Sequence, residues 1–127
     1  MKSLRSISWF GLVGACAALV HYVSAVVLEA HEWLSPAYAN FVAFLIAFPV
    51  SYFGHRYLSF AGNVRSHLHA LPRFLTVAIA GFTGNQILLL GLLQHSQLPF
   101  WIALAIVMLV IAIATFFSSK YWAFRHG

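Results

Sequence analysis

Four long apolar stretches, each followed by a more polar segment, dominate this sequence. A helix needs about 20 mostly apolar residues to cross the hydrocarbon core of a bilayer, and each stretch is long enough. Backbone polar groups in lipid need internal partners, so we expect every stretch to be helical. The sequence therefore predicts an all-α integral membrane four-helix bundle, a single transmembrane domain over residues 1–127. The expected spans cover about residues 9–28, 36–60, 74–93 and 98–124.

The composition excludes a soluble domain of this size. Only 7% of the 127 residues are charged and 62% are hydrophobic, whereas soluble domains carry about 25% charged residues. The basic start at Lys2 and Arg5 also suits a signal peptide. However, the first apolar run is too long for one, and no clear small-residue cleavage site follows it. We therefore expect the first stretch to be retained as a helix.

The Lys and Arg residues all fall on one side of the predicted bundle. The linkers at residues 29–35 and 94–97 contain none of them, whereas the linker at residues 61–73 contains two. The seven bases are Lys2, Arg5, Arg56, Arg65, Arg73, Lys120 and Arg125. Because cytoplasmic segments are enriched in Lys and Arg, the distribution predicts that both termini lie in the cytoplasm.

The ends of the second and fourth stretches repeat one pattern. Residues 53–60 are FGHRYLSF and residues 117–124 are FSSKYWAF, at an offset of 64 residues. The same offset relates Phe10 to Phe74 inside the other two stretches. An interfacial pattern of aromatics and bases that occurs twice is the simpler alternative. We interpret the chain as two tandem helical hairpins with the same orientation, related by an axis along the membrane normal. Their approximate bounds are residues 5–60 and 69–124.

Small residues at four-residue spacing predict where the helices pack, because small side chains let membrane helices approach closely. In the second stretch this face consists of Ala39, Ala43, Ala47, Ser51 and His55. Similar faces in the first and third stretches direct His21 and Asn85 toward the bundle interior. The spans also contain polar residues that we consider candidate site residues. They are His21, Ser51, His55, Asn85, Gln86 and Thr115.

Two interpretations of these polar residues stay open. An ionisable residue deep in a span is a functional hypothesis by default, which singles out His21. A neutral histidine bonded to a neighbouring backbone or hydroxyl group is equally consistent with the sequence. The amides of Asn85 and Gln86 are explained as well by hydrogen bonds between helices.

Two interpretations also stay open for the bases near the cytoplasmic helix ends. If the helices bundle, four of them ring one mouth: Arg56, Lys120, Arg5 and Arg73. Guanidinium forks match phosphate, so one hypothesis is a site for a single lipid phosphate. The alternative is that these side chains snorkel to the phosphates of ordinary membrane lipids.

Several function classes receive no support. The sequence contains no nucleophile–base–acid set, phosphate-binding glycine loop or paired carboxylates, so we expect no enzyme activity and no cofactor. His67 and His69 are a weak metal pattern without a Cys or carboxylate, and no metal site is expected. The few scattered bases do not indicate a nucleic-acid partner. No carboxylate lies within a span, since Glu29 and Glu32 are in a linker, and this argues against a small multidrug exporter.

The chain resembles the GtrA-like family of small bacterial membrane proteins over almost its whole length. The resemblance rests on the four-span layout, the opening at residues 10–14 (FGLVG) and the repeated helix ends. In the family these ends are close to N-F-L-L-N-R-x-W-x-F. Here the positions of the family's asparagines are occupied by Ser51, His55, Thr115 and Ser119. His21 stands where family members often have an acidic residue.

The resemblance implies a multi-pass protein of the bacterial inner membrane. Such a protein would move undecaprenyl-phosphate-linked sugars to the outer leaflet, for O-antigen, teichoic acid or other surface polysaccharide modification. On this hypothesis Arg56 and Lys120 hold the phosphate, Arg5 and Arg73 assist, and the candidate polar residues line a path for the sugar. The expected partners are undecaprenyl phosphate or its sugar conjugate, membrane lipids, a membrane glycosyltransferase and further copies of the chain. The alternative is a non-transporting accessory subunit of such a glycosyltransferase.

Overall fold

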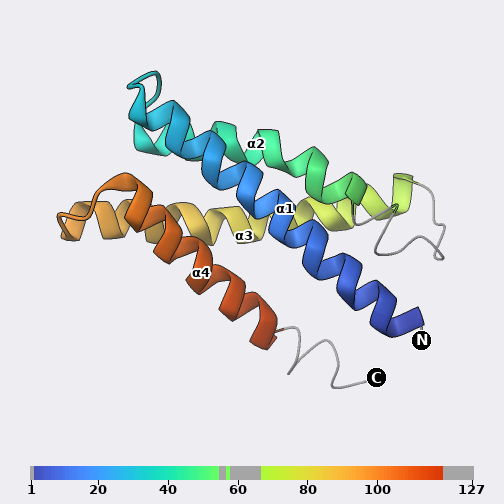
Figure 1. Cartoon of the computed structure of the whole chain (residues 1–127). Coiled ribbons are helices and arrows are strands. Elements are labelled where there is room, and N and C mark those ends of the chain that lie inside the picture. Colours follow the sequence, from blue (N-terminus) through green and yellow to red (C-terminus); the bar gives the residue numbers. More distant parts are fainter. Residues whose placement is uncertain (1, 55–56, 58–66, 119–127) are drawn as a thin grey trace.

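The computed structural model of the chain describes residues 2–54, 57 and 67–118. Within these residues every regular element is a helix, which confirms the all-α prediction. The four helices are α1 (Lys2–Ala30), α2 (Pro36–Gly54), α3 (His67–His95) and α4 (Phe100–Ser118). The two short connections, α1 to α2 and α3 to α4, lie at the same end of the molecule (Figure 1). The two hairpins therefore have the same direction.

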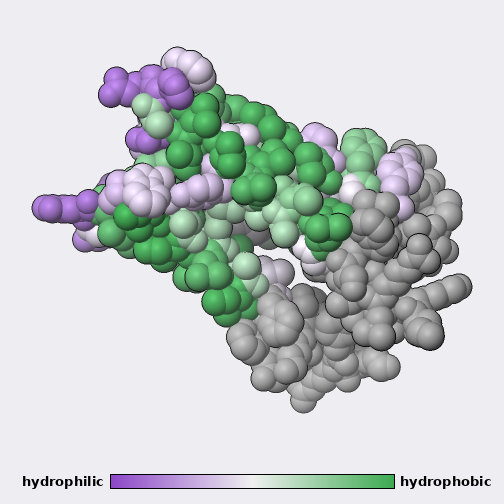
Figure 2. Space-filling model, viewed as in Figure 1, coloured by the Kyte–Doolittle hydropathy of each residue, from purple (hydrophilic) through white to green (hydrophobic). Residues whose placement is uncertain are grey.

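The helices present the apolar surface that a bilayer requires. Three apolar segments are long enough to cross a membrane, and α4 contains a shorter one, Phe100–Thr115. The three longer segments are Gly11–Ala30, Pro36–Gly54 and Leu75–His95. Hydrophobic residues cover the helices in Figure 2, and hydrophilic residues gather around the short connections. The chain is therefore a multi-pass membrane protein.

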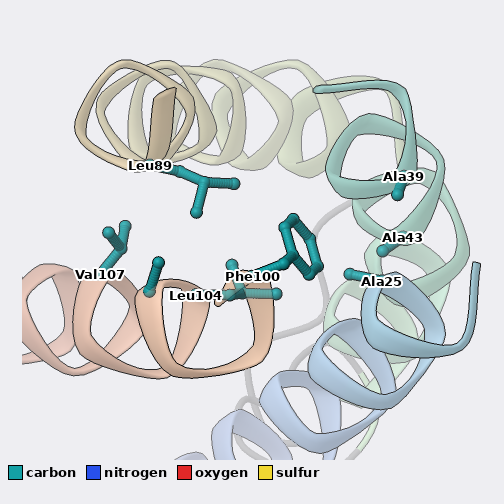
Figure 3. Packing of buried hydrophobic residues seen from close by; sticks show 8 residues of the cluster. Ala25, Ala39, Ala43, Leu89, Phe100, Leu104 and Val107 are labelled. Carbon is teal, nitrogen blue, oxygen red and sulfur yellow. The ribbon is translucent and has the colours of Figure 1, made fainter. Parts of the chain in front are cut away.

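The apolar core lies in the half of the bundle near the short connections. It is built by all four helices, and small residues of α1 and α2 face larger ones of α3 and α4 (Figure 3). Its members are Ala25, Ala39, Ala43, Leu89, Phe100, Ala103, Leu104 and Val107. The small-residue face predicted for α2 is buried at Ala39, Ala43 and Ala47. Because these side chains are short, α1 and α2 pack closely along their length.

In the part of the chain that the structure describes, the second hairpin packs against the first at this core and through Phe82, whose ring stacks on Phe44. Beyond it, Val77 of α3 and Leu109 of α4 are 70% and 62% exposed. The two helices diverge from their common connection in Figure 1. The bundle is thus compact at the end with the short connections and more open toward the other end.

Two helices contain a proline, Pro49 in α2 and Pro72 in α3. α2 continues through Pro49 to Gly54, although a proline removes one backbone donor. α3 begins at His67 and passes through Pro72, inside the segment expected to be a linker. The expectation for α3 rested on hydrophobicity, which locates the part of a helix in hydrocarbon but not its extension into the polar interface.

The turn after α1 is closed by a Schellman motif. The Glu32 N–H donates to the Glu29 carbonyl at 2.9 Å, and the Trp33 N–H donates to the Leu28 carbonyl at 3.1 Å. Glu32 therefore occupies the position after the helix cap, with φ at 58°. Glycine is usual there because a left-handed backbone crowds a Cβ atom. The motif fixes the short connection that reverses the chain into α2.

Equivalent residues of the two hairpins make equivalent contacts. The Tyr22 hydroxyl donates to the Trp101 carbonyl at 2.7 Å, and the Gln86 amide donates to the Ala37 carbonyl at 3.0 Å. These two bonds are related by the offset of 64 residues, because each joins the first helix of one hairpin to the start of the second helix of the other. The same offset relates buried residues in pairs: Ala25 and Leu89, Ala39 and Ala103, Ala43 and Val107. The bundle thus has an approximate two-fold relation between its hairpins.

Candidate functional site: a buried polar cluster between three helices

Four polar side chains from α1, α2 and α3 form one hydrogen-bonded cluster inside the bundle. The cluster consists of His21, Asn40, Asn85 and Gln86, and Asn40 lies at its centre. Asn40 Oδ1 is 2.7 Å from His21 Nε2. Asn40 Nδ2 is 2.8 Å from both Asn85 Oδ1 and Gln86 Oε1. We refer to these four residues as the polar cluster.

Three of the four side chains of the polar cluster are buried, and Gln86 is partly exposed. Asn40 is fully buried, Asn85 is 6% exposed and His21 is 9% exposed. Ala39 of the apolar core precedes Asn40 directly, and Leu89 lies one turn after Asn85. A polar group in such surroundings costs several kcal/mol when it lacks a partner. The hydrogen bonds of the polar cluster therefore hold the two hairpins in one relative position.

The orientation of every amide in the polar cluster follows from one backbone carbonyl. A carbonyl only accepts, so Gln86 presents Nε2 to the Ala37 carbonyl and Oε1 to Asn40. Asn40 therefore donates through Nδ2, and its Oδ1 faces His21. His21 must then carry its hydrogen on Nε2. Both amide hydrogens of Asn40 and one acceptor direction of its Oδ1 are engaged within the protein.

The family model of the GtrA/DPMS transmembrane domain matches residues 9–124. The chain belongs to this family. The match includes α2, α3, α4, most of α1 and the whole polar cluster, and it makes the chain a membrane protein related to polyprenyl-phosphate sugars. Neither the curated proteins nor the solved structures contain a significant match to the chain.

The structure brings together three of the candidate polar residues of this GtrA/DPMS-family chain. His21, Asn85 and Gln86 share the polar cluster, and His21 and Asn85 are buried as predicted. Ser51 is half-buried and Thr115 is exposed, and neither bonds to the polar cluster. His55, Arg56 and Lys120 lie outside the described residues. Arg5 and Arg73 belong to α1 and α3, but their side chains lie outside the described part of the chain.

Asn40 is the residue that sequence reasoning did not select for the site. A usable pattern exists, because Asn40, Ala43 and Ala47 are spaced as i, i+3 and i+7 and so share one helix side. An amide on the small-residue side of α2 is directed toward the neighbouring helices rather than toward lipid.

Proposed function

We propose that this chain moves undecaprenyl-phosphate-linked sugar from the cytoplasmic to the outer leaflet of a bacterial inner membrane. The sugar would then serve O-antigen, teichoic acid or other surface polysaccharide modification. One observation carries the proposal: four hydrogen-bonded polar side chains between three membrane helices, three of them buried. Membership of the GtrA/DPMS family supports the class of lipid.

The chemistry of the polar cluster suits a sugar rather than a phosphate. A sugar head group crosses hydrocarbon at a cost of several kcal/mol for each polar group that loses its partners. Amides and a histidine offer replacement hydrogen bonds without a full charge. The phosphate would be held separately by Arg56 and Lys120, assisted by Arg5 and Arg73, near the helix ends opposite the short connections. This division separates recognition of the charged and uncharged parts of one lipid.

The proposed activity needs no covalent step by the chain itself. A membrane glycosyltransferase would load the sugar onto the lipid in the cytoplasmic leaflet, and this chain would only move the product. The helices form a thin enclosure, so we propose that copies of the chain associate. The polar path would then lie within each copy or between copies.

A reconstitution experiment tests the proposal. The purified chain is inserted into liposomes with fluorescent undecaprenyl-phosphate-glucose, and the fraction of probe that reaches the opposite leaflet is followed by quenching. We expect wild-type protein to accelerate movement and the double variant Arg56→Ala, Lys120→Ala to lose at least about 90% of the rate, because two charge-assisted contacts are each worth about 1.5–3 kcal/mol. The matched control is Lys2→Ala with Arg65→Ala, which removes two cytoplasmic bases outside the proposed phosphate site. Wild-type liposomes that move the probe no faster than empty ones would contradict the proposal.

A specific observation favours the accessory subunit as a second candidate. Gly81 of α3 has open space where a Cβ atom would stand, and Ala80 beside it is exposed. Small residues on an open membrane face permit close approach of a further helix. An accessory subunit would co-purify with a glycosyltransferase and show no lipid movement alone, so the liposome assay separates the two candidates.

A further inference from the structure

We infer that the polar cluster contains a binding subsite for the hydroxyls of a sugar, to which Asn85 Nδ2 offers a donor and His21 Nδ1 an acceptor, with both side chains held in position by Asn40. This inference rests on the proposed function and adds to it the atoms that recognise the sugar. It also assigns a positioning role to Asn40, whose Oδ1 and Nδ2 both bond to other residues of the polar cluster.

Two groups of the polar cluster are left over after its internal bonds are made. Asn85 directs Oδ1 to Asn40, which leaves its Nδ2 as a donor. His21 donates from Nε2 to Asn40, which leaves Nδ1 of the neutral ring as an acceptor. In the part of the chain that the structure describes, neither Asn85 Nδ2 nor His21 Nδ1 has a hydrogen-bond partner. Both belong to side chains more than nine-tenths buried, at 6% and 9% exposure.

The leftover pair specifies the chemistry of its ligand. A sugar presents several hydroxyl groups, and a hydroxyl can both accept from Asn85 Nδ2 and donate to His21 Nδ1. A phosphate only accepts, and it carries a charge that the polar cluster does not balance. A hydrocarbon chain satisfies neither group, so lipid would leave both unpaired at a cost. A water molecule has the same chemistry as a sugar hydroxyl, and the experiment below distinguishes these two sources.

Asn40 determines which groups are left over. It accepts from His21 and donates to Asn85, so it sets both the histidine tautomer and the direction of the Asn85 amide. Without Asn40, the Asn85 amide is free to rotate and the His21 proton is free to occupy either nitrogen. Asn40 thus acts on the ligand through its two neighbours.

Two substitutions of His21 separate its donation to Asn40 through Nε2 from the acceptor that it offers to the ligand through Nδ1. Glutamine places an amide donor near the position of Nε2, so His21→Gln preserves donation to Asn40 and removes the leftover acceptor. Asparagine places its amide near the position of Nδ1, so His21→Asn breaks the bond to Asn40 instead. The variants are compared in nanodiscs for thermal stability and for affinity toward three probes: undecaprenyl-phosphate-glucose, undecaprenyl-phosphate-mannose and undecaprenyl phosphate.

We expect His21→Gln to keep the wild-type melting temperature and to bind at least one glycolipid about three- to ten-fold more weakly, the effect of one lost hydrogen bond. Its affinity for undecaprenyl phosphate stays unchanged. His21→Asn lowers the melting temperature.

Asn40→Leu reduces the ratio of glycolipid affinity to undecaprenyl phosphate affinity. The control is Thr83→Val, which removes a hydroxyl bonded to the Ile79 carbonyl of its own helix and leaves this ratio unchanged.

The outcomes separate this inference from the proposed function. If wild-type protein binds none of the three probes, the proposed function fails. If it binds both glycolipids no better than undecaprenyl phosphate, or if His21→Gln leaves glycolipid affinity at the wild-type value, the leftover groups hold water only and the inference is overturned.

Discussion

At the scale of single residues, Glu32 has a left-handed backbone conformation, which residues with a Cβ atom adopt only at a cost in free energy. Its φ of 58° is required by the Schellman motif that ends α1. A left-handed conformation costs about 1–2 kcal/mol for residues other than glycine. The connection between α1 and α2 therefore retains an unfavourable residue at the position where glycine is preferred.

We expect Glu32→Gly to leave the stability unchanged or to raise it by up to about 1 kcal/mol, because relief of the crowded Cβ outweighs the greater freedom of glycine in the unfolded chain. The measurement is the melting temperature of the purified protein in detergent. Glu29→Gly is the matched control, since it makes the same chemical change inside the last turn of α1. That control should lose about 0.5–1 kcal/mol. A lower melting temperature for Glu32→Gly than for Glu29→Gly would contradict this explanation.

The candidate site was predictable from the sequence only in part. The inward direction of His21 and Asn85 followed from helix periodicity, because each lies on a face with small residues. The role of Asn40 depends on which helices become neighbours, and periodicity along one helix does not contain that information. The tautomer of His21 depends further on the Ala37 carbonyl of another helix, through Gln86 and Asn40.

At the scale of helices, the close approach of α1 and α2 depends on Gly54. A Cβ atom at this position would lie 2.6 Å from Cγ1 and 3.1 Å from Cγ2 of Val13. Valine cannot easily turn away, because its branched side chain has one strongly preferred rotamer in a helix. Position 54 therefore accommodates only glycine at this distance between α1 and α2.

We expect Gly54→Ala to destabilise the protein by about 1–3 kcal/mol, the usual cost of overpacking a closely packed contact. The melting temperature reports the loss, and adding Val13→Ala should restore part of it because the clashing methyl groups are removed. Gly81→Ala serves as the control, since nothing lies within 4 Å of the added Cβ. Equal melting temperatures for Gly54→Ala and Gly81→Ala would contradict the close contact.

The helices themselves were more predictable than their contacts. Apolar length located all four, and four-residue spacing identified the face of α2 that contains Ala39, Ala43 and Ala47. α3 begins at His67, before the span expected at about residues 74–93, because the helix extends beyond its apolar part. The opening between the far ends of α3 and α4 has no sequence pattern, because exposed residues such as Val77 are as apolar as buried ones in a membrane protein.

At the scale of the whole molecule, the common end of the two short connections has a direct topological consequence. Both connections must lie on one side of the membrane, since the hairpins have the same direction (Figure 1). The distribution of Lys and Arg predicts that this side is the outer one. The orientation of the protein in the membrane therefore depends on its Lys and Arg residues, whereas the direction of one hairpin relative to the other depends on helix packing.

Cysteine labelling tests this orientation. In a Cys16→Ser background, new cysteines at His31 and Gln97 should react with a membrane-impermeant maleimide in intact spheroplasts, because both positions are exposed in the short connections. A cysteine at Arg65 should react only after the membrane is opened. Labelling of position 65 in intact spheroplasts, without labelling of positions 31 and 97, would reverse the orientation.

Asn40 and Leu104 occupy equivalent positions in the two hairpins, and their difference shows what a single chain permits. The two residues are equivalent by the offset of 64, and both are fully buried, yet one is polar and the other is not. Two separate copies of a single hairpin would carry the same residue at both positions, so any site on their axis would be duplicated or symmetric. In a single chain, position 40 has an amide while its counterpart at position 104 has a hydrocarbon side chain. The interior of the bundle is therefore asymmetric, although its two hairpins are arranged almost symmetrically.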